Sequence, residues 1–92
     1  MNTCFKIKYV GRKQLKDYAG MNYYAAKSMG FKPLMPKDVI YVDRNMSVAN
    51  KLRTVKHEEE EAHLMAKGYP YFRAHKLALK AEYKKFRKWE RQ

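Results

Sequence analysis

The sequence predicts a small α+β domain, in which a two- or three-stranded sheet packs against helices in the order β-α-β-α-α. Ninety-two residues are enough for one domain, residues 1–92, and leave little room for a second. Hydrophobic residues make up 46% of the chain, which is ample for a folded core. Two short segments have the pattern of strands, and the stretches after each of them have helical spacing.

The first expected strand covers residues 4–10. Polarity alternates there through Lys6 and Lys8, which is typical of a strand with one buried face. Gly11 ends this segment. We therefore expect a half-buried strand at the start of the chain.

The segment 13–29 follows, with apolar residues at helical spacing. It predicts one helix or two short ones, closed by Gly30 as a C-terminal cap. Gly20 is a weak point of this helix, and Asn22 is the one polar residue on its apolar face. Residues 31–37 contain two prolines and are expected to form a loop.

Residues 39–42 are β-branched and aromatic, and they predict a second strand with a turn at 43–45. Ser47 is a good N-cap for a helix that runs to about Lys67, and Gly68 is suited to end it.

Pro70 suits the first turn of a last helix, which continues to about Trp89. The segment 68–70 should fold this helix back against the previous one as an αα-hairpin. Side chains from the two helices would then face each other.

The charge balance is strongly basic, with 21 Lys and Arg against nine Asp and Glu, a net charge of +12. Such a surface attracts phosphate-rich or acidic partners. The single cysteine, Cys4, excludes an intramolecular disulfide framework and fits a reducing compartment. No segment approaches the roughly 18 consecutive apolar residues of a membrane span, so we expect a cytoplasmic protein.

The helix expected over 47–67 has its apolar side at Leu52, Val55, Ala62 and Ala66. His57 and Glu61 lie roughly opposite, about 40° apart, and can reach one cation. Glu58 lies about 100° round the helix from His57, where it could approach a metal-bound water. The arrangement follows the logic of a His-Glu-x-x-His helix, with a carboxylate in place of the second imidazole.

The last helix offers further ligands. His75 and Glu82 are two turns apart and therefore share a face. The hairpin could bring His75 to the site as a third ligand, with Glu82 as a fourth ligand or a partner for an imidazole N–H. Imidazole and carboxylate suit Zn²⁺, and Mn²⁺ or Fe²⁺ are conceivable.

Residues 52–61, preceded by the strand 39–42, resemble the strand and active-site helix of zincin-like metallopeptidases. A fuller pattern resembles small zincin-like proteins from phages and archaea over roughly the second half of the chain: His57-Glu58-x-x-Glu61, Leu64-Met65, Gly68, Tyr69, Ala74-His75, Ala78 and Glu82. The resemblance implies His57 and Glu61 as metal ligands, Glu58 as general base and a third ligand from the following helix. It implies hydrolysis of an amide in a peptide or protein. The second histidine of the commonest zincin helix is missing here.

Other interpretations fit the same residues. Any run of four glutamates contains the Glu-x-x-Glu pattern, and such a run is usually a solvated helix face. Glu59 and His63 point toward the apolar side, so the helix could be rotated, or these two could form a buried pair or be the ligands. His75 alone could be a partly buried structural histidine.

The last helix also supports an alternative function, a non-enzymatic module that binds nucleic acid or another protein. Basic residues alternate there with aromatic ones, and they could pair with phosphates, an anionic membrane or an acidic protein. The residues we would assign to nucleic acid are Lys80, Lys84, Lys85, Arg87 and Lys88.

Overall fold

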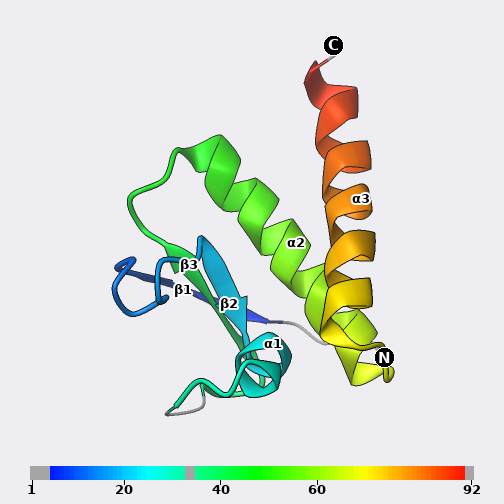
Figure 1. The fold of residues 1–92 in the computed structure, drawn as a ribbon. Helices are drawn as coiled ribbons and strands as arrows, with labels where there is room; N and C mark the ends of the chain where they lie inside the picture. Colours follow the sequence, from blue (N-terminus) through cyan, green and yellow to red (C-terminus); the bar gives the residue numbers. More distant parts are fainter. Residues whose placement is uncertain (1–4, 33–34, 91–92) are drawn as a thin grey trace.

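The computed structural model describes residues 5–32 and 35–90, with side chains described as far as Ala81. It is an α+β fold, as predicted, with a three-stranded sheet packed against helices (Figure 1). Its elements are β1 (Lys6–Val10), β2 (Gly20–Asn22), α1 (Tyr23–Ser28), β3 (Val39–Asp43), α2 (Val48–Ala66) and α3 (Tyr71–Glu90). Cys4, the first residue of the predicted strand, lies outside the described residues.

The strand order is β1-β3-β2. β3 is the central strand, parallel to β1 and antiparallel to β2. Its side chains Ile40 and Val42 are fully buried, as expected of a strand with a neighbour on each side and helices packed on the sheet. The short β2 is an edge strand, and α2 packs against both β2 and β3. In Figure 1, α3 stands on the far side of α2 from the sheet.

The prediction of helix over 13–29 is wrong for most of that segment. Residues 12–17 form hydrogen-bonded turns instead, in which Lys16 and Asp17 both have positive φ, a left-handed conformation that no helix continues through. Leu15 is fully buried within the apolar core cluster, and the Arg12 guanidinium binds the Asp43 carboxylate at 2.6 Å. Tertiary contacts therefore override the local helical spacing.

Only the end of that segment is helical. Asn22 closes β2 and caps α1, because its side-chain oxygen accepts a hydrogen bond from the backbone N–H of Ala25 at 2.9 Å. Gly30 follows α1 with φ of 74°, which confirms it as the residue that ends the helix.

The predicted ends of α2 are confirmed, but its predicted buried face is wrong. The Ser47 hydroxyl accepts from the backbone N–H of Asn50, and Gly68 follows the helix with φ of 109°. The helix is rotated from the expected position: Leu52 is 48% exposed, whereas the buried residues are His57, Glu58, Glu61 and Ala62. α2 packs against the sheet and α3 at once. Its buried polar side chains have hydrogen-bond partners on both of these neighbours, Asn22 on β2 and His75 on α3.

Of the helices in the described part of the chain, none has the length and apolar character needed to cross a membrane.

Candidate metal centre

The hairpin between α2 and α3 brings His75 against α2. Gly68 ends α2, and Tyr69 donates its backbone N–H to the Leu64 carbonyl, which closes the turn. On α3, the alanines Ala74 and Ala78 flank His75 and are fully buried. Small side chains at these positions let the two helices approach closely, so the predicted hairpin places residues of both helices in one site.

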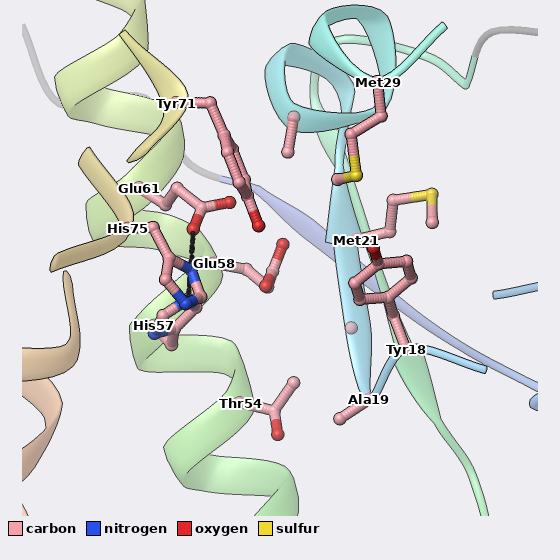
Figure 2. A pocket seen from close by; sticks show the side chains of 12 residues that line it. Tyr18, Ala19, Met21, Met29, Thr54, His57, Glu58, Glu61, Tyr71 and His75 are labelled. Carbon is pink, nitrogen blue, oxygen red and sulfur yellow. Dashed lines mark hydrogen bonds and ion pairs between the residues drawn. The ribbon is translucent and has the colours of Figure 1, made fainter. Parts of the chain in front are cut away.

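Three side chains from these helices meet there (Figure 2). His57 Nε2 lies 3.1 Å from Glu61 Oε2 and 3.1 Å from His75 Nδ1. His75 Nδ1 lies 2.9 Å from Glu61 Oε2. The three atoms therefore form a nearly equilateral triangle, and the structure brings together three of the four predicted ligands.

Hydrogen bonding alone does not account well for this triangle. Each imidazole nitrogen carries at most one proton, and the ionised carboxylate oxygen of Glu61 carries none, so three mutual contacts share at most two protons. A cation would satisfy all three lone pairs at once. Zn²⁺ ligand distances of about 2.0–2.2 Å from all three atoms are met at a point about 1 Å out of their plane. The donor set therefore fits a divalent cation.

Glu61 is suited to be the anionic member of the set, because its side chain is only 2% exposed. Burial by itself raises the pKa of this carboxyl. The hydrogen bonds with His57 and His75, the charge of His57 and a hydrogen bond from Asn22 act in the opposite direction, and together they hold the pKa of Glu61 below its usual value. The carboxylate is therefore ionised at neutral pH and can share the charge of a bound cation.

Asn22 also belongs to the site, although the sequence pattern identifies it only as a polar residue on an apolar face. Its side chain is fully buried. The amide nitrogen donates to Glu58 Oε1 at 2.9 Å and to Glu61 Oε1 at 3.0 Å. The signal in the sequence was this isolated polar residue, but its partners lie 36 and 39 residues away and no local spacing identifies them.

A cavity of about 330 Å³ opens over the cluster. His57, Glu58 and Glu61 line it from α2, and His75 lines it from α3. The opposite wall is largely apolar and comes from β2, α1 and the residues beside them: Tyr18, Ala19, Gly20, Met21, Ala25 and Met29. Figure 2 shows Glu58 and Glu61 directed from α2 toward this hollow. A substrate in the cavity would therefore lie between β2 and the cluster.

Tyr71 covers the cluster from the first turn of α3. Its ring stacks on the His75 ring at 5.5 Å between centroids, and this contact holds the imidazole in place. Burial and then the negative charge of Glu61 raise the pKa of the Tyr71 hydroxyl. The hydroxyl therefore keeps its proton at neutral pH and lines the cavity as a hydrogen-bond donor.

The other predicted ligands have different outcomes. Glu82 belongs to α3, but its side chain lies outside the described residues. His63 contacts the Phe5 ring at 5.3 Å between centroids, and Glu59 is partly exposed. Neither belongs to the cluster of candidate ligands found among the described residues.

The basic residues of the alternative function are only partly described. Lys80 is exposed on α3. The side chains of the other four lie outside the described residues: Lys84, Lys85, Arg87 and Lys88. A nucleic-acid surface on this helix therefore stays a prediction.

No known protein family, curated protein or solved structure matches this chain. The function is therefore inferred from the geometry and chemistry of the site.

Proposed function

We propose that the chain binds one divalent cation, Zn²⁺ in the first instance, through His57 Nε2, His75 Nδ1 and Glu61 Oε2, and that the site hydrolyses an amide bond in a peptide. The observation that carries the proposal is the convergence of these three atoms at the edge of a cavity. Three protein ligands with an open fourth position are the arrangement of catalytic zinc, whereas structural zinc is usually closed by four. Mn²⁺ and Fe²⁺ suit the same donor atoms.

Glu58 is the proposed general base. When bound, the cation would supply a water of lowered pKa and polarise the substrate carbonyl. The Glu58 carboxylate lines the same cavity, adjacent to His57 in the sequence, and accepts the proton of the attacking water. The water oxygen bonds to the carbonyl carbon, the carbon–nitrogen bond breaks, and Glu58 returns the proton to the leaving amine nitrogen. Bonds and protons then balance without a redox partner.

The position of β2 supports a peptide as the substrate. β2 is an edge strand, and residues 19–21 line the cavity. The backbone groups on the outer side of an edge strand can pair with an extended peptide. Tyr18, Met21 and Met29 would surround an apolar side chain of that peptide.

Two substitutions separate binding from catalysis. His57→Ala removes a ligand and should abolish tight Zn²⁺ binding. Glu58→Gln keeps the size of the side chain and leaves all three ligands in place, so it should retain Zn²⁺ but lower hydrolysis by about 10²–10⁴-fold. The assay incubates the zinc-loaded protein with a mixture of peptides and detects new amino termini by mass spectrometry.

A wild-type protein that binds Zn²⁺ and cleaves no peptide would contradict the enzymatic part of the proposal and leave a structural metal site. Cleavage by Glu58→Gln at the wild-type rate would contradict the role of Glu58. A chain that does not bind any of the three metals would contradict the proposal as a whole.

A further inference from the structure

We infer that Asn22 is a positioning residue, which keeps Glu61 as a ligand through one oxygen and holds Glu58 beside the metal site as a base. The inference rests on the proposed function. It concerns a residue outside the ligand set, on a different element of the fold, and it explains how two neighbouring carboxylates on one helix can have different roles.

The orientation of the Asn22 amide is determined by its surroundings. Its oxygen accepts the backbone N–H of Ala25 at the start of α1, at 2.9 Å. The amide nitrogen must therefore face α2, where its two protons have one acceptor each, Glu58 Oε1 and Glu61 Oε1. Because Asn22 is fully buried, water does not take over these contacts.

Glu61 consequently has a separate partner for each oxygen. Oε1 accepts from Asn22 at 3.0 Å, and only Oε2 faces the two imidazole nitrogens. A carboxylate held in this way offers one oxygen to a cation. The site then has three ligand atoms, and a fourth position stays open for water or substrate.

Glu58 is restrained by the same nitrogen. Its Oε1 lies 2.9 Å from Asn22 Nδ2, and the carboxylate is held toward β2 and away from the triangle formed by His57, Glu61 and His75. The same amide nitrogen therefore fixes the positions of both carboxylates. Glu58 can therefore lie close to the cation without becoming a ligand.

Helix capping alone does not explain an asparagine at this position. Serine and aspartate cap a helix about as well, since each offers a side-chain oxygen to the first turn. Of these three, only asparagine also has two N–H donors on the same side chain. Serine has one short hydroxyl, and ionised aspartate has no donor. An asparagine is therefore needed at position 22 because its amide donates to both Glu58 and Glu61.

The experiment uses substitutions that keep the cap. Zn²⁺ affinity is measured by competition with a chelator, and Co²⁺ is used as a spectroscopic probe of coordination number. Asn22→Ser should bind Zn²⁺ about 10–100-fold more weakly than the wild type, as is typical when a partner of a metal ligand is lost. Its Co²⁺ absorption should weaken, because the freed Glu61 Oε1 can become an additional ligand.

Asn22→Asp is the second variant, in case the serine variant does not fold. It also caps α1 and lacks the N–H donors, so its Co²⁺ spectrum should change in the same direction. Asn50→Ser is the matched control, because Asn50 is exposed in the first turn of α2, away from the site. It should leave affinity and spectrum at wild-type values.

The outcomes separate the two proposals. If the wild type binds neither ion, the proposed function fails and this inference fails with it. If the wild type binds and a folded Asn22→Ser or Asn22→Asp variant retains both the Zn²⁺ affinity and the Co²⁺ spectrum, the proposed function stands and the role of Asn22 is overturned.

Discussion

Gly20→Ala should weaken metal binding although Gly20 is not a metal ligand, because β2 and α2 pack closely at this position. A Cβ at Gly20 would lie 2.5 Å from Thr54 Cγ2, 3.1 Å from Glu58 Cγ and 3.2 Å from the Tyr41 carbonyl oxygen. Carbon atoms in contact normally lie about 3.5–4.0 Å apart, so β2 and the Thr54 side chain must separate by about 1 Å.

That movement has two consequences. Overpacking of this kind costs about 1–3 kcal/mol of unfolding free energy. In a domain of this size each kcal/mol corresponds to about 4–8 °C, so the Tm of the metal-free protein should fall by about 4–24 °C. Asn22 lies two residues further along β2 on the same face, and a shift of about 1 Å would stretch its bonds to Glu58 and Glu61 beyond hydrogen-bond length.

The assay combines thermal unfolding with Zn²⁺ titration, and a second substitution makes it specific. Thr54→Ser removes the methyl group with the closest contact, so the double variant Gly20→Ala/Thr54→Ser should recover part of the stability and of the Zn²⁺ affinity. If Gly20→Ala retains the wild-type Tm and affinity, β2 is not packed against α2 as described. If the double variant recovers neither, the Thr54 contact is not the cause.

Three further predictions concern the metal, the acid stability and the alternative function. Zn²⁺ at 100 times its Kd should stabilise the fold by about 2.7 kcal/mol, or about 11–22 °C in a thermal scan, and the shift should vanish with chelator and in His75→Ala. The backbone N–H of Asn45 and the Arg12 guanidinium lower the pKa of Asp43. The contribution of Asp43 to the free energy of unfolding is therefore complete above the ordinary carboxyl pKa and is lost as the pH falls through the lower pKa of the folded state. In Asp43→Asn, the free energy of unfolding measured in urea should therefore decrease less as the pH is lowered. If the alternative function holds, the affinity for an oligonucleotide should fall steeply with salt concentration and should not change with chelator. The affinity should also weaken when the basic residues near the C-terminus are neutralised: Lys84, Lys85, Arg87 and Lys88.

The sequence predicted those features whose cause is local. Ser47 and Gly68 are recognisable because a cap acts within a few residues. The approach of His57 to Glu61 follows from a four-residue step in a helix, and His75 joins them because a short hairpin reverses the chain.

The features that the sequence did not predict depend on distant contacts. The left-handed turn at Lys16 and Asp17 is accompanied by the bond between Arg12 and Asp43, 31 residues apart, and this turn replaces the expected helix. The polar buried face of α2 is stable because of partners such as Asn22, which no helical periodicity reveals.

Anomalous diffraction at the zinc absorption edge, from crystals of the chain grown with Zn²⁺, tests the convergence of the three ligands most directly. We predict one peak at about 2.0–2.2 Å from His57 Nε2, His75 Nδ1 and Glu61 Oε2, with Glu58 outside the coordination shell. The account would be contradicted by a zinc peak at another position, for example beside His63, or by the absence of a peak at a saturating zinc concentration.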